Sequence, residues 1–478
     1  MHKILVKQII SGDTSKNISI GEGSIANGIT TSAIGAYSHA EGKSAYSIGG
    51  YSHAEGGFSR ANGDGSHAEG LYTTAIGGYS HTEGLSTISI GDYSHTEGQG
   101  TTSIGGYSHA EGLYTVAIEN GSHAEGGFTT SFGILSHVEG CYCISFGMYS
   151  HAEGSDTKSI GMASHAEGIG TTAIGYYSHS EGLNTTAVGY HSHSEGFAAK
   201  SIGMLSHSEG IYALAIGGYS HAEGYYTTAV GEYSHAEGDN TIAVGLASHS
   251  EGQNTTAIGR YSKSRGQFTI AIGDMSHSEG IYTTAIGQLS HSEGIYTIAI
   301  GAGSHAEGYR TTALGEYSKT MGVDSFTLNR YQNSIGNRRF DNNNLKSISQ
   351  KSEIVLNNIT TNNTQQYLFI ESPFKLKFNP GMSAIIDIDV VAVTSGSAIP
   401  DCAGWNLKLF GICRNTSSID YFSIPYQSTT VLHKTTNAAS WNVTASAANN
   451  GELDLIVTGQ NGKTIYWTGY VKWVESGF

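Results

Sequence analysis

A 14-residue repeat fills about two-thirds of the chain and constrains its fold more than any other feature. Histidine recurs at every fourteenth position from His39 to His305 without a slip in phase, and Lys263 is the one substitution. Most repeats read Ser-His-(Ala/Ser/Thr)-Glu-Gly and then, after a short variable stretch, Thr-x-(Ala/Ser)-Ile-Gly. Self-similarity at a short fixed period indicates a solenoid, whose coils are stable only when they stack on one another.

The repeat and its limits predict an all-β chain with four parts. The phase can be followed from position 25 to position 319, which gives about 22 coils of a parallel β-roll, or solenoid, shaft over residues 18–325. Residues 1–17 are expected to be an N-terminal attachment segment. Residues 326–366 are polar and rich in Asn, so they predict a connector. Residues 367–478 are expected to form a separate tip.

Each coil has the period of a β-strand rather than of a helix. Ser38 and Ala40 are small and share one face of a strand, whereas His39 and Glu41 share the other. Later in each coil, small residues again alternate with larger ones. A coil of fourteen residues is thin, so we place the Ala, Ser, Thr and Gly side chains inside, where the two strands approach each other closely. Glycine is then expected where the backbone turns tightly.

With the small residues inside, one aliphatic or aromatic side chain per coil lies on the outer surface. A contiguous apolar stripe of this kind marks an interface, and a symmetric oligomer would bury it between chains. Asn62 interrupts the stripe once, and Arg60, Lys158 and Lys200 occupy the neighbouring position, which must reach solvent. We therefore expect a homotrimer whose interface includes Ile76, Ile90, Ile104, Phe132, Phe146, Ile160, Val188 and Ile202.

At these residues the sequence resembles a known family. The pattern Ala-x-Ala-x-Gly-x-x-Ser-x-Ala-Ile-Gly is the head repeat of YadA-type trimeric adhesins, and residues 109–119 read His-Ala-Glu-Gly-Leu-Tyr-Thr-Val-Ala-Ile-Glu, with Glu119 in place of the usual glycine. The Ser-His-Ala-Glu-Gly form is similar to repeats of bacteriophage tail fibres and related viral fibres. The resemblance covers about residues 18–325. It implies a left-handed, trimeric β-roll. It does not indicate a ligand, because the head domains of this family bind various partners.

The resemblance implies an adhesive or structural fibre. YadA-type surface adhesins need a signal peptide, a coiled-coil stalk and a C-terminal membrane barrel, and we recognise none of these in the sequence. We therefore expect a viral or phage fibre made in the host cytoplasm and located on the virion. Its expected partners are other virion or tail components and a host glycan or protein. The first alternative is a bacterial surface adhesin or extracellular filament, and the second is a metal-binding rod.

Alternating strand patterns and all four tryptophans distinguish the C-terminal part. Phe374–Phe378, Ile386–Val390 and Ile465–Trp473 alternate in hydropathy. Several short strands over about 110 residues predict an antiparallel β-sandwich or jelly roll. Aromatic side chains that stack on sugars are candidates for receptor or carbohydrate binding, although burial in the sandwich core is the alternative. The candidates are Trp405, Tyr421, Tyr426 and Trp441.

The recurring His and Glu raise the question of a metal site. Both project from one strand face, and neighbouring coils add further ligands at about 4.8 Å. However, Lys263 and Arg265 replace both residues in one coil, which a divalent-cation site would not tolerate. A solvated ladder of paired His and Glu is the simpler interpretation. We expect no cofactor, and the pair His191 and His193 is a weak metal candidate.

A catalytic or ice-binding role fits the repeat poorly. Adjacent Ser and His lie on opposite faces of a strand, whereas a Ser-His-Glu triad needs them in contact, so we expect no enzyme. Ice binding needs a uniform Thr face, and the corresponding position varies among Thr, Ile, Val, Lys and Leu. Tyrosines cluster at the two turns of the coil, as at Tyr72 and Tyr79. They either stack on one another, which we favour, or bind sugars.

Composition limits the remaining classes of function. The net charge is -16, which disfavours nucleic acid because such binding needs clustered Lys and Arg. No run of about 20 apolar residues is present, so we expect no membrane insertion, and residues 1–10 do not resemble a secretory signal. Cys141, Cys143, Cys402 and Cys413 lack the spacing of a disulfide framework or a zinc site, so we expect thiols rather than disulfides.

Overall fold

A computed structural model describes residues 17–340, 347–370, 375–378, 381–395, 400–416, 419–448 and 451–477. Within these ranges the chain is all-β, as expected. They contain no α-helix, and the one 3-10 helix is η1 (Thr436–Ala438). The chain divides into two compact units, residues 1–233 and residues 234–478. Each unit has its own coils and is described by itself.

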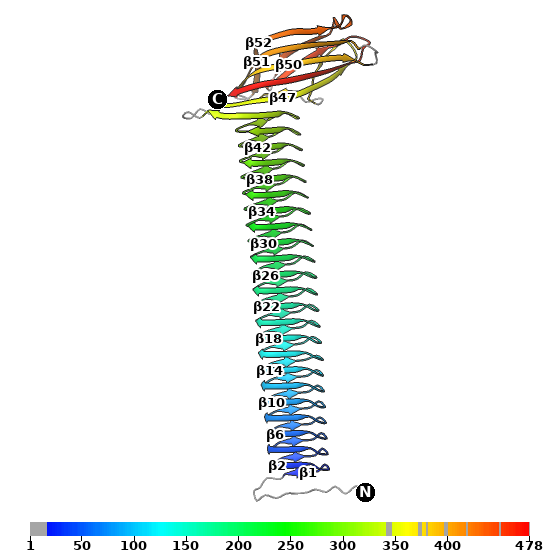
Figure 1. Ribbon diagram of the computed structural model, residues 1–478, viewed down its shortest axis with the longest axis vertical. Helices are drawn as coiled ribbons and strands as arrows, with labels where there is room; N and C mark the ends of the chain where they lie inside the picture. The colour runs from blue at the N-terminus through cyan, green and yellow to red at the C-terminus, as the bar shows by residue number, and fades with distance from the viewer. Residues whose placement is uncertain are drawn as a thin grey trace. The chain divides into compact units, whose positions relative to one another are not determined.

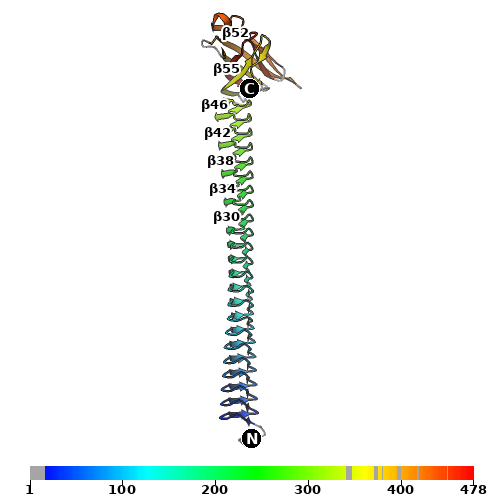
Figure 2. The same cartoon turned by 90° about the vertical axis from the view of Figure 1, so that its right-hand side faces the viewer.

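The first unit is a parallel β-solenoid with one coil for every 14 residues (Figures 1 and 2). Each coil has one five-residue strand, from β2 (Ile25–Ile29) at 14-residue intervals to β30 (His221–Tyr225). Each also has one two-residue strand, from β1 (Ile18–Ser19) to β31 (Thr228–Ala229). Each strand pairs in parallel with the corresponding strand of the next coil, so a residue lies beside the one fourteen positions later, as His81 lies beside His95. The predicted β-roll is confirmed.

Small side chains fill the interior of each coil, as the period-two pattern predicted. Ser38 and Ala40 are buried, and so are Thr73 and Ala75 in the second half of the repeat. Many interior hydroxyls bond to one another or to the backbone; for example, Ser38 Oγ donates to the Gly35 carbonyl at 2.7 Å. Others, such as that of Thr73, have no hydrogen-bond partner. The two sheets of the coil therefore meet through a thin layer that has no room for a large side chain.

The close approach of neighbouring coils explains the glycine that recurs near the end of each five-residue strand. Gly70 has φ +113°, and an added Cβ there would lie 2.1 Å from the Gly84 carbonyl oxygen of the next coil. Both the positive φ and the close approach exclude any side chain. The turns also place non-glycine residues in the left-handed region, among them Tyr72 (φ 60°) and Tyr79 (φ 58°). The turns thus point aromatic side chains outward at regular intervals.

The second unit begins with coils of the same kind. Its longer strands run from β32 (His235–Asp239) to β44 (Lys319–Gly322), and its two-residue strands run from β33 (Ile242–Ala243) to β45 (Phe326–Thr327). In the described part of the chain, the two-residue strands of the coils form a sheet of 23 strands, one more than the number of coils expected. The additional coil forms because the spacing of fourteen residues continues through β45.

A six-stranded sheet continues from the last coil of the second unit. Strand β46 (Asn333–Phe340) pairs in parallel with β44 and antiparallel with β47 (Ser347–Thr360). From β47 the antiparallel order runs through β55 (Ile465–Gly477), β50 (Met382–Thr394), β51 (Cys402–Thr416) and β52 (Ile419–Lys434). Residues 326–366, which were expected to be a connector, therefore contain regular strands. The backbone hydrogen bonds of these strands join the last coil to the large sheet.

A smaller antiparallel sheet packs against this large sheet. Strand β54 (Glu452–Thr458) pairs with β53 (Asn442–Ala447) on one edge, and on the other with β48 (Gln365–Tyr367) and β49 (Leu376–Lys377). The two sheets enclose one hydrophobic core that contains all four tryptophans. The two-layer arrangement around this core is the antiparallel C-terminal β-sandwich that the alternating strand patterns predicted.

Buried polar groups connect the sandwich to the last coil. The Asn329 side chain donates to the Lys377 carbonyl at 2.9 Å and accepts the Lys377 N–H at 2.8 Å. Gln350 accepts the Phe326 N–H at 2.9 Å and donates to the Glu475 carboxyl group. Burial raises the pKa of Glu475, against the hydrogen bond from Gln350 that stabilises its anion. Side-chain amides thus satisfy backbone groups where the coil meets the sandwich.

Candidate assembly and binding surfaces

The predicted interface residues belong to a stripe on the outer surface, in which each residue directly follows a two-residue strand, as Ile76 follows β9 (Thr74–Ala75). We call this set, one residue per coil, the apolar stripe. Its eight predicted members are each 38–46% exposed in the single chain, although they are large and apolar. Phe132 and Phe146 stack with their ring centroids 4.6 Å apart. A contiguous apolar surface of this kind is rare on a protein that stays monomeric.

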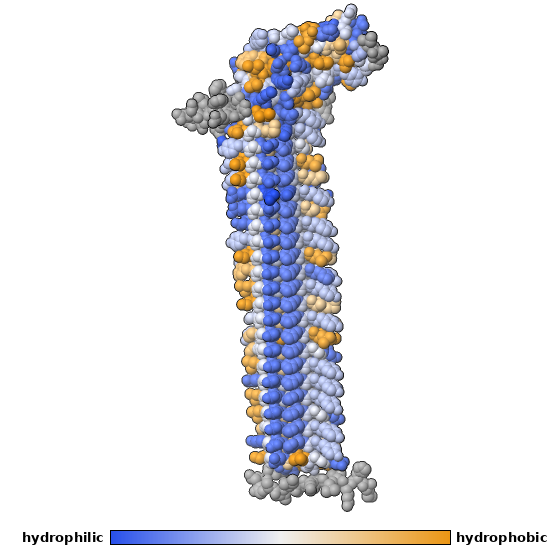
Figure 3. All heavy atoms as spheres, in the orientation of Figure 1, coloured by the Kyte–Doolittle hydropathy of each residue, from blue (hydrophilic) through white to orange (hydrophobic). Residues whose placement is uncertain are grey.

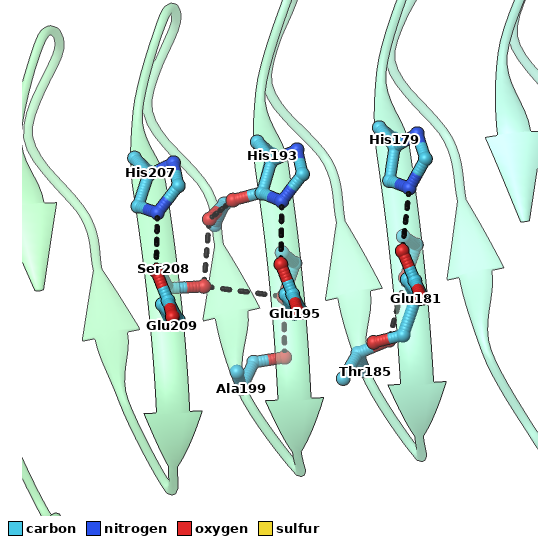
Figure 4. Close-up of polar contacts among 12 residues, drawn as sticks. His179, Glu181, Thr185, His193, Glu195, Ala199, His207, Ser208 and Glu209 are labelled. Atoms are coloured by element: carbon cyan, nitrogen blue, oxygen red, sulfur yellow. Dashed lines mark hydrogen bonds and ion pairs between the residues drawn. The ribbon is translucent and has the colours of Figure 1, made fainter. Parts of the chain in front are cut away.

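The opposite surface of the coil carries two polar columns, formed by the His and Glu of each five-residue strand. We call it the polar face. Figure 3 shows it as hydrophilic columns flanked by hydrophobic patches. Successive imidazoles lie with centroids 4.5–4.9 Å apart, and most of these pairs are stacked. Where His and Glu of one coil pair, Nε2 lies 3.2–3.9 Å from Oε2, as Figure 4 shows for His179 and Glu181. The predicted His-Glu ladder is confirmed.

Burial within this column lowers the pKa of several histidines below the ordinary value of 6.5. For each, desolvation is the largest cause and a neighbouring imidazole is the second, while the Glu carboxylates act in the opposite direction. The effect is a property of the stack, because each imidazole is covered by at least one neighbouring ring; His277 and His305, at ends of the stack, have Lys263 and Lys319 on their other side. The residues are His53, His67, His81, His123, His151, His193, His277 and His305.

The geometry does not assemble a metal centre from these columns. The residues that the structure describes contain no group of three or more His, Cys, Asp or Glu side chains that could hold a metal ion. His191 and His193 belong to different columns: His191 stacks on Tyr177 at a turn, and His193 stacks on His179 in the polar face. In the altered coil, Arg265 Nε lies 3.4 Å from Glu251 Oε2. The His/Glu array is therefore a column of paired side chains.

Aromatic columns follow the two turns of the coil. Tyr79, Tyr93 and Tyr107 stack with successive centroids 5.2 and 5.1 Å apart. At the other turn, Tyr114 and Phe128 are 5.4 Å apart. The favoured interpretation, that these rings stack on one another, is confirmed. Because stacked rings cover each other's faces, they leave mainly their edges for a sugar.

The sandwich corrects part of the predicted receptor site. Trp405 and Trp441 are both 0% exposed and lie in the hydrophobic core, where each packs against Trp467. They are core residues and cannot contact a ligand without unfolding the sandwich. Tyr421 lies in β52, but its side chain falls outside the described part of the structure. Tyr426 is 60% exposed, so of the four candidates it is the one described at the surface.

Sequence reasoning missed an apolar row around Tyr426. Val474, Ile385, Phe410 and Tyr426 are directly opposite one another on the adjacent strands β55, β50, β51 and β52. They are 38–68% exposed on the outer face of the large sheet. We call these four residues the sandwich row. The consecutive Ile385 and Ile386 were the available signal, because in an alternating strand one of two adjacent apolar residues must face outward.

A cavity of about 340 Å³ lies where the last coil meets the sandwich. Glu316, Arg330, Lys375, Lys377 and Glu452 contribute to its lining. Much of the charge there is paired inside the protein, because Arg330 binds Glu316 and Lys375 Nζ lies 2.7 Å from Asp454 Oδ1. The arrangement is that of a polar joint between two parts of the second unit.

Two further features bear on the class of protein. Among the described residues, no helix is both long and apolar enough to cross a membrane. The four cysteines all lie within the described ranges as thiols rather than disulfides, and Cys143 and Cys413 are buried.

Comparison with known proteins identifies the coils. The YadA head domain repeat matches seven segments of the solenoid, in both compact units. No curated protein matches the chain. The matched segments are residues 68–94, 97–118, 166–192, 208–234, 236–262, 264–290 and 292–318.

Proposed function

Because the coils across residues 68–318 are YadA-like head repeats, we propose that the chain is the subunit of a trimeric adhesive fibre on a virus or phage particle. Such repeats in a β-solenoid imply a trimeric, adhesin-like fibre, and they suggest a protein that is exposed outside the cell or on a surface. The proposal adds that three chains associate through the apolar stripe, and that the fibre attaches the particle to its host.

The exposed stripe is the observation that carries the proposal. Its side chains are about two-fifths exposed in a single chain, and covering the remainder is worth on the order of 1 kcal/mol per side chain. Over roughly twenty coils this gain exceeds the about 4–15 kcal/mol that association costs in lost freedom of motion. Three chains with their stripes turned inward would bury every coil's apolar residue and leave the polar faces in solvent.

The sandwich supports attachment at one end of each subunit. The sandwich row, which includes Tyr426, offers apolar and aromatic surface. Two positions along the same strands, Asp387 lies opposite Lys408 and Lys472. Such mixed patches suit a host glycan or protein. A trimer presents three copies of this surface. Binding by one copy raises the effective concentration of the other two, so weak individual contacts give a strong total attachment.

We propose a structural rather than catalytic role for the repeats. Ser52 is buried inside the coil, whereas the adjacent His53 lies on the outer polar face. This placement supports the view that Ser and His do not act together in a nucleophilic triad. The same contacts recur in coil after coil, as expected for a stacking function.

A bacterial surface adhesin or extracellular filament is the second candidate. The same coils, stripe and sandwich would serve it, and the family of the repeats favours it as much as the viral fibre. The two candidates differ in location: a viral fibre is found on purified particles and is encoded beside tail or capsid genes, whereas a surface adhesin fractionates with the cell envelope.

Two measurements test the proposal. Light scattering on the purified full chain gives its mass in solution, and we expect three times the 50.3 kDa of one chain. A stable monomer would remove the trimer and, with it, the proposed fibre. Antibody labelling of purified particles and of cell-envelope fractions then separates the viral from the bacterial assignment.

A further inference from the structure

One polar residue interrupts the apolar stripe. In the 23 coils that the structure describes, the stripe position holds Ile, Val, Leu or Phe in every coil except one, where it holds Asn62. Asn62 lies between Ile48 and Ile76, both of which are exposed on the outer surface. The interruption therefore falls within the surface that the proposed trimer buries.

One polar atom of the Asn62 side chain lacks a hydrogen-bond partner in the single chain. Its backbone N–H donates to the Ala75 carbonyl at 2.7 Å, as in the other coils. Its side-chain Oδ1 is buried and has no hydrogen-bond partner. A buried amide oxygen without a donor destabilises the state in which it occurs. Covering it with the apolar stripe of another chain would leave the whole amide group without partners.

The repeat creates a problem that such a residue solves. If one chain slides along another by fourteen residues, nearly every Ile of the stripe meets another Ile, and most contacts are restored. The stripe alone therefore specifies the alignment of the chains poorly. In coiled coils, a single polar residue in an apolar seam fixes the register of the strands, because any other alignment leaves it unpaired.

We propose that Asn62 fixes the register of the three chains. With the chains aligned, three Asn62 amides meet at the threefold axis. Rotation of each amide about its Cβ–Cγ bond turns Oδ1 from its buried position toward the axis, where the NH₂ of one chain donates to Oδ1 of the next in a closed ring. Sliding by one coil places each amide against Ile48 or Ile76 instead. This inference rests on the proposed trimer and adds the residue that aligns its subunits.

Two other irregularities, one beside the stripe and one within it, differ from Asn62. Lys158 occupies the neighbouring position, and its Nζ lies 3.9 Å from Asp156 Oδ1, so this cation has a partner within its own chain. Phe132 and Phe146 are larger than Ile but equally apolar, and they stack on each other. They serve as matched controls, because replacing both with Ile changes the shape of the stripe and not its polarity.

The test measures register directly by disulfide formation between full-length chains with two different tags. All chains carry Cys141→Ser. One chain carries Ile104→Cys, and the other carries either Ile104→Cys or Ile118→Cys. With Asn62 present, 104–104 bonds should dominate. Asn62→Ile should raise the ratio of 104–118 to 104–104 bonds at least about tenfold, whereas the double variant Phe132→Ile, Phe146→Ile should leave it unchanged.

A second variant, called the swapped chain because Asn62 and Ile76 exchange places, tests the register separately from stability. In the variant Asn62→Ile, Ile76→Asn, the amide moves by one coil. Co-expressed with a chain that keeps Asn62, it should favour bonds from position 104 of the unswapped chain to position 118 of the swapped one, each position carrying its introduced thiol. An unchanged ratio in both experiments would overturn the role of Asn62. A chain that is monomeric and forms no such bonds would instead overturn the proposed trimer.

Discussion

His193 Nε2 lies 3.4 Å from Glu195 Oε2 on the same strand, and the His193 ring also stacks on His179 and His207, with centroids 4.9 and 4.8 Å away. An imidazole inside the column, such as His193, thus has an acid beside it and an imidazole above and below it. The acid favours protonation, whereas the stacked rings and burial oppose it. In the eight shifted residues the second influence is stronger, so the pKa is lowered.

The lowered histidine pKa values predict that the fold loses stability in mild acid. In the unfolded chain these histidines titrate near 6.5, and in the folded chain they titrate lower. The unfolded state therefore binds more protons below pH 6.5, and the free energy of unfolding falls as the pH decreases through that window. Denaturant titrations of the full chain at pH 7.5 and 5.0 measure it. Equal or greater stability at pH 5.0 would contradict the prediction.

Glycine at the end of the five-residue strand should be irreplaceable. Gly70→Ala places a Cβ 2.1 Å from the Gly84 carbonyl oxygen at a positive φ, so the coils must separate locally. We expect a loss of at least about 3 kcal/mol, as for other severe steric changes. Gly50→Ala is the control, because its nearest neighbour is 3.5 Å away and its φ is ordinary. Thermal melts of both variants should differ clearly, and equal melts would exclude this packing argument.

A charge in the apolar stripe should prevent assembly. Ile104→Asp puts a carboxylate into the proposed interface, where a trimer would bury three carboxylates, one from each chain, away from water. We expect mostly monomer by light scattering. Leu113→Asp is matched in exposure, at 38% against 40% for Ile104, but lies at the end of the five-residue strand β14 (His109–Leu113), outside the stripe. It should remain trimeric, and a trimer in both variants would place the interface elsewhere.

The two kinds of aromatic residue in the sandwich should respond differently to truncation. Trp441→Ala removes a fully buried indole and its Nε1 hydrogen bond to Gln460, at 3.3 Å. We expect a loss of about 3–5 kcal/mol, visible in the near-ultraviolet circular dichroism of the melt. Tyr426→Ala should leave that transition in place and weaken attachment of the fibre to host cells. Normal attachment by a folded Tyr426→Ala protein would exclude this tyrosine from the binding surface.

The sequence was most informative where its pattern repeats. The burial of Ala40 and the exposure of Ile76 follow from a period of two in a coil too thin for large side chains. Both were predictable because many coils carry the same pattern, so an exception in one coil does not change which positions are assigned to the interior and which to the surface.

The sandwich was less predictable because it has no repeat. Trp405 and Tyr426 are both aromatic residues on neighbouring strands, yet one is buried and the other exposed. Residue type does not decide which face of a strand is covered, since the packing of the second sheet does. Strand β46 was missed for a related reason: its polar sequence resembles a connector, but backbone pairing with β44 holds it in the sheet.

The pairing of β46 with β44 on one side and β47 on the other has a mechanical consequence. Tension applied to the sandwich would load the last coil through rows of backbone hydrogen bonds. The load would pass from one strand ladder directly to the next and be shared by many hydrogen bonds at once.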